Sequence, residues 1–254
     1  MRVCNTASNN DGGRDANRGP DGRAASARLL DPRALTCYFV TGRIPDLDWE
    51  EECAEITRIA ARAAAGGAGV IQVRSKPITV RQLTELSIKV ASAVADANPN
   101  AVVLIDDRVD VAAALMAEHN IHGVHIGQDD LDPQLARAVL GDEAIIGLTT
   151  GTLELVEGAN DYADVIDYVG AGPFRPTPTK NSGREPLGLA GYPALVAASA
   201  VPVVAIGDVR AEDAAELAAT GVAGLAIVRG IMQAEDPKAY AESVVSQFSG
   251  ANER

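Results

Sequence analysis

Residues 170–180 read GAGPFRPTPTK and directly follow a short hydrophobic run at 165–169. A run of this length, bounded by glycine and proline, predicts a buried strand. The two glycines after it permit close approach of the backbone, and the three prolines stiffen the path. Thr177, Thr179 and Lys180 add hydroxyl groups and a cation, which favour binding of an anion. A rigid surface loop with an incidental lysine is the alternative.

The composition fits one large α/β domain or two small ones. The chain has 254 residues, of which 47% are apolar and only 4% aromatic. Its 22 basic and 35 acidic residues give a formal charge of −13, which argues against nucleic acid or an acidic membrane as a partner. An anionic substrate must therefore bind at a local positive cluster on an acidic protein.

Cysteine spacing and hydropathy indicate the cellular setting. Cys4, Cys37 and Cys53 have no CxxC spacing and predict neither a disulfide framework nor a zinc site. No run reaches about 18 apolar residues, the length needed to span a membrane, and the N-terminus lacks the apolar core of a signal peptide. We therefore expect a reduced, cytoplasmic enzyme. The oligomeric state is left open, and a homo-oligomer is compatible with the sequence.

Residues 1–30 are polar and without period, which predicts a disordered leader before a catalytic domain at 31–254. Beyond the leader, strand-like runs alternate with Ala-rich amphipathic stretches. The expected strands are 35–41, 69–74, 101–105, 123–126, 144–148, 165–169, 202–206 and 224–228. The expected helices are 49–65, 80–97, 109–118, 133–140, 153–160, 192–200, 211–219 and 237–248.

Eight strand–helix units in succession predict parallel strands joined by right-handed crossovers. This number fits a closed (β/α)8 TIM barrel better than an open doubly wound sheet, although counting units does not show closure. In such a barrel, the loops that follow the strands share one face and carry the chemistry. The residues after each strand are therefore the candidates for a functional site.

The second strand runs into QVRSK, with Gln72, Arg74 and Lys76 at alternate positions. In an extended segment this spacing directs all three side chains to one side. An amide, a guanidinium and an ammonium group together suit a diphosphate attached to a polar ring. A solvated basic edge is the alternative.

Carboxylates follow the third and fourth strands. Asp106 and Asp107 end one run, and Asp129 and Asp130 end GVHIGQDD. Because neighbouring parallel strands lie about 4.8 Å apart, carboxylates past both ends can converge on one cation. Oxygen ligands beside a diphosphate suit Mg²⁺. The alternative for any single aspartate is a helix N-cap, the role we expect of Asp132.

Later strand ends supply further polar groups. Thr149 follows the fifth strand, and its hydroxyl serves either as a helix cap or as a ligand contact. Gly207 and Asp208 follow the seventh strand, and Val228 and Arg229 the eighth, where this fold usually binds phosphate on backbone N–H groups. Two anion sites are thus predicted. They suit an enzyme that joins two phosphorylated molecules or cleaves one bisphosphorylated substrate.

The histidines His119, His122 and His125 cluster in the sequence but do not predict a metal site. In or beside a strand, a separation of three directs His122 and His125 to opposite faces. We expect His125 to have a structural or supporting role.

Taken in order, these motifs resemble the thiamine phosphate synthase family, also called thiamine-phosphate pyrophosphorylase. The resemblance covers residues 37–248 and rests on YFVTGR, QVRSK, IDDRVDVAAA, GVHIGQDDL, IIGLTT, DYVGAGPFRPTPTK, PLGL, VPVVAIGDV and GLAIVRGI. It implies a (β/α)8 enzyme that joins hydroxymethylpyrimidine diphosphate to a thiazole phosphate. In the family, diphosphate leaves first, and the thiazole nitrogen traps the pyrimidine-methyl cation.

The resemblance also implies roles for individual residues. Gln72, Arg74 and Lys76 would hold the pyrimidine diphosphate, with Asp107 and Asp130 on Mg²⁺. Asp106 would line the pyrimidine side, and Thr149 would sit where the family has a serine near the reacting centre. Lys180 would neutralise the departing diphosphate. The thiazole phosphate would be bound by loop and turn residues, namely Thr177, Thr179, Gly207, Asp208, Val228 and Arg229.

Four positions depart from the family pattern, and the first of them is Ser75, which replaces a usual glutamate. Asp106 stands where an asparagine usually contacts the pyrimidine, Asp208 replaces a glycine, and Arg229 replaces a serine beside the phosphate. We expect Arg229 to compensate the charge of Asp208. The alternatives are a sibling thiazole tautomerase, a non-catalytic regulator that binds thiamine phosphate and, less favoured, a barrel isomerase of phosphorylated sugars.

Overall fold

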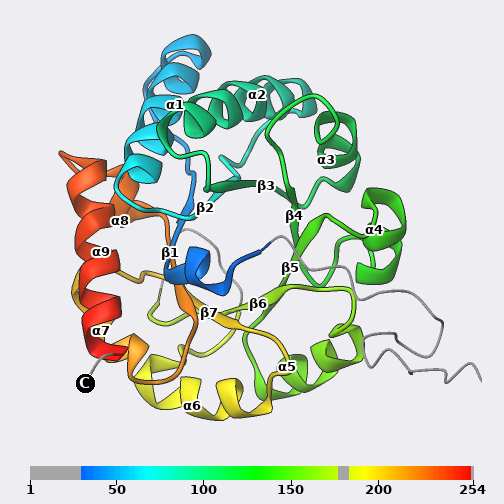
Figure 1. The fold of residues 1–254 in the computed structure, drawn as a ribbon, viewed down its shortest axis with the longest axis vertical. Helices are drawn as coiled ribbons and strands as arrows, with labels where there is room; N and C mark the ends of the chain where they lie inside the picture. The colour runs from blue at the N-terminus through cyan, green and yellow to red at the C-terminus, as the bar shows by residue number, and fades with distance from the viewer. Residues whose placement is uncertain (1–29, 177–182, 253–254) are drawn as a thin grey trace, which may run out of the picture.

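The computed structural model describes residues 30–176 and 183–252. The leader expected at 1–30 falls almost wholly outside the described residues, as do Thr177, Thr179 and Lys180. Within the described ranges, eight parallel strands close into a barrel in sequence order, and helices surround it (Figure 1). The barrel predicted from strand–helix alternation is confirmed, and an open sheet is excluded.

The strands are short and buried, and their bounds are β1 Cys37–Val40, β2 Val70–Val73, β3 Val102–Asp106, β4 Gly123–Ile126, β5 Ile145–Thr150, β6 Tyr168–Ala171, β7 Val203–Ile206 and β8 Gly224–Ile227. The helices are α1 Trp49–Ala65, α2 Val80–Ala97, α3 Val109–Leu115, α4 Pro133–Leu140, α5 Leu153–Ala159, α6 Gly188–Ala198, α7 Ala214–Ala218, α8 Arg229–Met232 and α9 Pro237–Asn252. Short 3-10 helices occupy η1 Pro32–Thr36, η2 Asn160–Tyr162 and η3 Ala211–Asp213.

Several expected boundaries are wrong. The sixth strand begins at Tyr168 rather than at 165, because the N–H groups of Val165 and Ile166 bond to Tyr162 O in a turn. The helix expected at 211–219 divides into η3 and α7. The helix expected at 192–200 runs instead over Gly188–Ala198, with Pro193 inside it.

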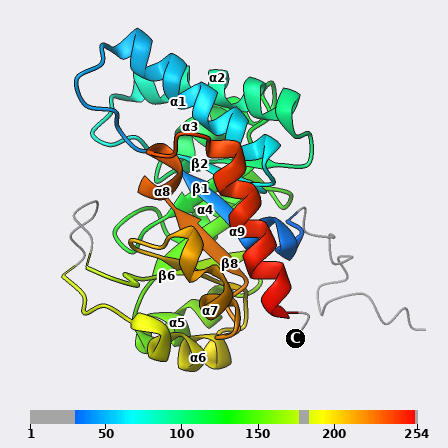
Figure 2. The same ribbon diagram turned by 90° about the vertical axis from the view of Figure 1, so that its left-hand side faces the viewer.

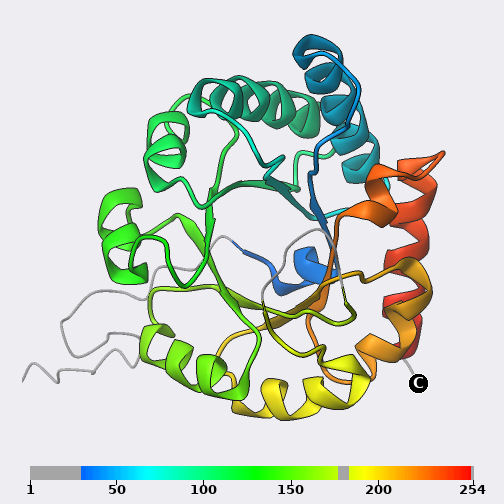
Figure 3. The same cartoon turned by 180° about the vertical axis from the view of Figure 1, so that it is seen from behind.

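Apolar side chains fill two layers, one between strands and helices and one inside the barrel. The 3-10 helix η1 closes the end of the barrel at which the strands begin, and Leu35 packs inside with Tyr38 and Val40 (Figures 1 and 3). Gly69, just before β2, permits this approach, since a Cβ atom there would lie 2.5 Å from Ala34 O. The inner space is therefore filled at one end, and the site lies at the other.

The helix α9 packs lengthwise against α1 and α7 and closes the outer ring (Figure 2). None of the helices in the described part of the chain combines the length and apolar character that crossing a membrane requires.

Candidate active site

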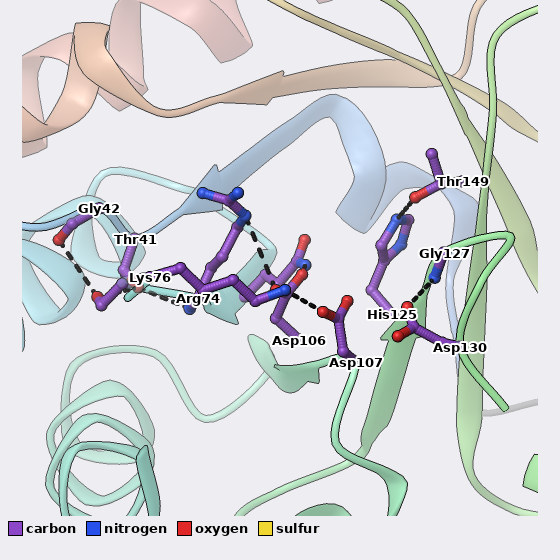
Figure 4. Close-up of polar contacts among 12 residues, drawn as sticks. Thr41, Gly42, Arg74, Lys76, Asp106, Asp107, His125, Gly127, Asp130 and Thr149 are labelled. Atoms are coloured by element: carbon purple, nitrogen blue, oxygen red, sulfur yellow. Dashed lines mark hydrogen bonds and ion pairs between the residues drawn. The ribbon is translucent and has the colours of Figure 1, made fainter. Parts of the chain in front are cut away.

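A cavity opens at the carboxyl ends of the strands, where the loops of the barrel face one another. It is lined by many of the residues expected from the sequence, namely Gln72, Arg74, Asp106, Thr149, Gly207, Asp208, Val228 and Arg229. Lys76, Asp107 and Asp130 lie beside this group at the ends of β2, β3 and β4 (Figure 4). Thr177, Thr179 and Lys180 are outside the described residues.

The side chains of the QVRSK motif converge on Asp106. Gln72 Nε2 donates to Asp106 Oδ1 at 2.5 Å. Asp106 Oδ2 lies 2.9 Å from Lys76 Nζ and 3.7 Å from Arg74 Nε. The sequence prediction that these three side chains gather on one side is confirmed.

The extended conformation predicted for residues 72–76 is wrong. The strand β2 ends at Val73, and Ser75 has a φ of 38° in the left-handed region. The Ser75 hydroxyl is buried and bonds to Thr41 Oγ1 at 2.9 Å and to Gly42 O at 3.2 Å. A tight, hydrogen-bonded turn therefore brings Lys76 back over the end of β3.

Asp106 is more deeply buried than the charged side chains of Arg74, Lys76 and Asp107 around it. Only 6% of its surface is exposed, and burial together with the neighbouring Asp107 raises its pKa. Burial alone would lower the pKa of Lys76, but the carboxylates of Asp107 and Asp106 raise it instead. Lys76 thus stays protonated and supplies the positive charge that this buried carboxylate needs.

Asp107 and Asp130 are the candidates for holding a divalent cation. Asp107 forms an ion pair with Lys76, and Asp130 Oδ2 accepts from Gly127 N at 2.6 Å (Figure 4). Burial raises the pKa of Asp130, and the like charge of Asp107 adds to that effect. Two interacting carboxylates from neighbouring strand ends are hard oxygen ligands, so this donor set fits Mg²⁺ with other oxygens completing its shell.

The remaining acidic and histidine predictions have separate outcomes. Asp132 caps α4, as expected, accepting from Gln134 N at 2.9 Å. His122 and His125 do lie on opposite faces, since His122 Nδ1 accepts from Val103 N whereas His125 lines the cavity. Among the described residues, no group of three or more metal-ligating side chains is found.

Thr149 is not at a helix start. It lies in β5, which continues to Thr150, and Thr152 caps α5 by accepting from Leu155 N at 3.2 Å. Thr149 Oγ1 faces the cavity and lies 2.9 Å from His125 Nε2 (Figure 4). The role as a helix cap is therefore wrong, and the contact with a ligand stays a prediction.

Two buried tyrosines that the sequence did not single out complete the cavity floor. Tyr38 and Tyr168 are almost fully buried, and their hydroxyl groups lie 2.7 Å apart. The Tyr38 hydroxyl donates to Gln72 Oε1 at 2.8 Å, and the Tyr168 hydroxyl lies 2.9 Å from His125 Nδ1. In the sequence, both tyrosines look like ordinary apolar strand residues. Only the register of β1 and β6 in the closed barrel brings their hydroxyl groups together.

The loops after β7 and β8 form the other side of the cavity. Gly207 has a φ of 103°, and a Cβ atom there would lie 2.5 Å from Pro173 Cα. Arg229 Nη2 contacts Asp208 Oδ1 at 2.6 Å, which bears out the expected compensation of charge. Arg184 also lines the cavity, and its Nη1 donates to Thr150 O at 2.6 Å.

Comparisons with known proteins agree in sequence and in structure. A family model described as thiamine monophosphate synthase matches residues 37–231. The thiamine-phosphate synthase of Corynebacterium jeikeium is 76% identical over 220 residues, which are 87% of this chain and 97% of that protein. The thiamine-phosphate synthase of Corynebacterium efficiens is 58% identical over 217 residues, which are 84% of this chain and 95% of that protein.

Solved structures show the same relationship. A thiamine phosphate pyrophosphorylase from Pyrococcus furiosus superposes with a TM-score of 0.72 at 29% identity, covering 87% of this chain and 98% of that chain. The orotidine 5'-phosphate decarboxylase of Pyrococcus horikoshii reaches a TM-score of 0.59 at 12% identity, covering 84% of this chain and 99% of that chain. At that identity the likeness shows the fold alone.

Proposed function

This chain belongs to the thiamine monophosphate synthase family, and from that premise we propose how the residues of its barrel perform the reaction. The protein is a thiamine-phosphate synthase, a transferase that joins hydroxymethylpyrimidine diphosphate to a thiazole phosphate and releases diphosphate. The observation that carries the assignment of the site is the convergence of Gln72, Arg74 and Lys76 on Asp106.

The pyrimidine diphosphate binds on the β2–β3 side of the cavity. Gln72 and Asp106 offer an amide and a carboxylate for hydrogen bonds to the aminopyrimidine ring. Arg74 and Lys76 lie next to them and supply positive charge for the diphosphate. A bound diphosphate competes with Asp106 and Asp107 for Lys76, so these ion pairs rearrange when the substrate binds.

The thiazole phosphate binds on the opposite side, at the turns after β7 and β8. Gly207 has no side chain to cover its backbone N–H group, which can bind phosphate. Arg229 supplies a cation next to Asp208. Val228 lines the same wall of the cavity. The family pattern also assigns Thr177 and Thr179 to the thiazole phosphate and Lys180 to the departing diphosphate, and these three roles stay predictions.

Departure of the diphosphate leaves a pyrimidine-methyl cation, which the ring nitrogen of the thiazole traps. This nitrogen carries no proton, so the reaction needs stabilisation of the leaving group more than a general base. Arg74 and Lys76 supply part of that stabilisation. Asp107 and Asp130 would hold Mg²⁺, which when bound neutralises charge on the diphosphate.

The test is product formation from both phosphorylated halves with Mg²⁺, followed by chromatography of thiamine phosphate. Equimolar thiamine phosphate and diphosphate, each dependent on the thiazole phosphate, are expected. A tautomerase would change the thiazole without releasing diphosphate, and a regulator would bind thiamine phosphate without turnover. Either result would overturn the proposal.

A further inference from the structure

Five hydrogen bonds join Thr149 to Asp106 across the floor of the cavity. They connect side chains of β5, β4, β6, β1, β2 and β3, which is nearly the whole barrel. The successive distances from Thr149 to Asp106 are 2.9, 2.9, 2.7, 2.8 and 2.5 Å, and the intervening side chains are His125, Tyr168, Tyr38 and Gln72. We call this set the Thr149–Asp106 chain.

The direction of the chain is decided at Asp106. Its carboxylate, paired with Lys76 at 2.9 Å, only accepts hydrogen bonds, so the amide nitrogen of Gln72 must face it. The amide oxygen of Gln72 then faces Tyr38, whose hydroxyl donates to it. Because the Tyr38 hydroxyl has one proton and donates it to Gln72, its oxygen must accept a hydrogen bond from the Tyr168 hydroxyl.

The same reasoning fixes His125 and Thr149. The Tyr168 proton is given to Tyr38, so the Tyr168 oxygen accepts from Nδ1–H of His125. In a neutral imidazole, Nε2 then carries the lone pair and accepts from the hydroxyl of Thr149. Burial raises the pKa of both tyrosines, which keeps their protons in place.

We propose that Asp106, besides offering an acceptor to the pyrimidine ring, has a positioning role: it fixes the direction of the Thr149–Asp106 chain, so that Thr149 presents an oxygen lone pair to the bound pyrimidine. This inference rests on the proposed function. In that reaction, the lone pair lies where it can stabilise the positive charge that develops as diphosphate leaves. An asparagine at 106 has both a donor and an acceptor. With its NH₂ turned to Gln72, every bond of the chain reverses, and Thr149 points its proton at the substrate.

The packing around the chain supports a single, rigid arrangement. Gly147 pairs with His125 on one side and Tyr168 on the other. A Cβ atom at Gly147 would lie 2.6 Å from His125 Nδ1 and would clash with the Tyr168 ring. The absence of a side chain at this position therefore makes room for the contact between Tyr168 and His125.

The test is ¹⁵N NMR of the full-length protein labelled at histidine, at neutral pH, with a His125→Gln variant to assign the resonances. The wild type is expected to show His125 as the Nδ1–H tautomer. In Asp106→Asn that preference should be lost or reversed, and in Tyr168→Phe it should weaken. Tyr192→Phe is the control. The Tyr192 hydroxyl is also buried, but it donates to Ala171 O and takes no part in the Thr149–Asp106 chain.

Activity gives a second readout. Asp106→Asn should lower kcat about tenfold, the effect of roughly one hydrogen bond, with a smaller change in KM for the pyrimidine diphosphate. An Nε2–H or doubly protonated His125 in the wild type would overturn the proposal, as would an unchanged tautomer in Asp106→Asn. Failure of the proposed function would appear separately, as absence of diphosphate release with the tautomer still fixed.

Discussion

Arg229 and Asp208 form an ion pair at the edge of the cavity, with Arg229 Nη2 2.6 Å from Asp208 Oδ1. Asp208 has a φ of 55°, a conformation that favours glycine, and Arg229 is the first residue of α8. A carboxylate next to a phosphate is unfavourable unless a cation compensates it. The arginine therefore makes the aspartate tolerable at a turn where phosphate is expected to bind.

Changing Arg229 to Ser should raise KM for the thiazole phosphate, because Asp208 then keeps, among the described residues, only the longer contact with Arg210, at 3.5 Å. We expect an increase of about tenfold, corresponding to roughly 1.4 kcal/mol, measured by steady-state kinetics at fixed pyrimidine diphosphate. The double variant Asp208→Gly with Arg229→Ser should recover much of the loss. An unchanged KM in the single variant would show that the pair does not serve the phosphate.

Changing Gly147 to Ala should reduce both stability and activity. The new Cβ overlaps the Tyr168 ring and lies 2.6 Å from His125 Nδ1, so the two side chains must move apart. Overpacking of this kind costs about 1–3 kcal/mol in the free energy of unfolding, measured with urea. Gly158→Ala is the matched control, since nothing lies within 4 Å of its Cβ position. Equal effects in both variants would contradict the account.

Stability should fall at acid pH because of His122. Burial lowers the pKa of His122 from its ordinary value of 6.5, and its Nδ1 accepts from Val103 N. The unfolded chain binds a proton near pH 6.5 that the folded protein binds only at lower pH, so this contribution is present above 6.5 and is lost as pH falls. In His122→Asn the unfolding free energy should decline less between pH 7.5 and about pH 5. Parallel pH profiles for the two proteins would refute this cause.

The sequence predicted the barrel and the ends of its strands more fully than the contacts between them. Gln72, Arg74, Asp107 and Asp130 could be found because polar residues directly after buried strands stand out from the apolar pattern. The ion pair of Arg229 with Asp208 could be expected because both residues depart from the family pattern at the same phosphate turn and carry opposite charges.

Other features depend on register and on turns that carry no sequence period. Tyr38 and Tyr168 look like ordinary buried strand residues, and only closure of the barrel sets their hydroxyl groups 2.7 Å apart. Lys76 reaches Asp106 through the left-handed turn at Ser75, which alternation did not predict. The apolar run of β5 ends before Thr149, so the sequence predicts a helix start there, whereas the strand continues to Thr150.

The central claim is that diphosphate leaves from a site built by the ends of β2, β3 and β4. Its most direct test is the rate of diphosphate release with both substrates and saturating Mg²⁺, compared between wild type, Asp130→Ala and Asp142→Ala. Asp142 is an exposed residue of the turn after α4, so its variant controls for loss of one negative charge. We predict release that requires the thiazole phosphate, falls by about 100-fold in Asp130→Ala and is unchanged in Asp142→Ala. Full activity in Asp130→Ala would contradict the account.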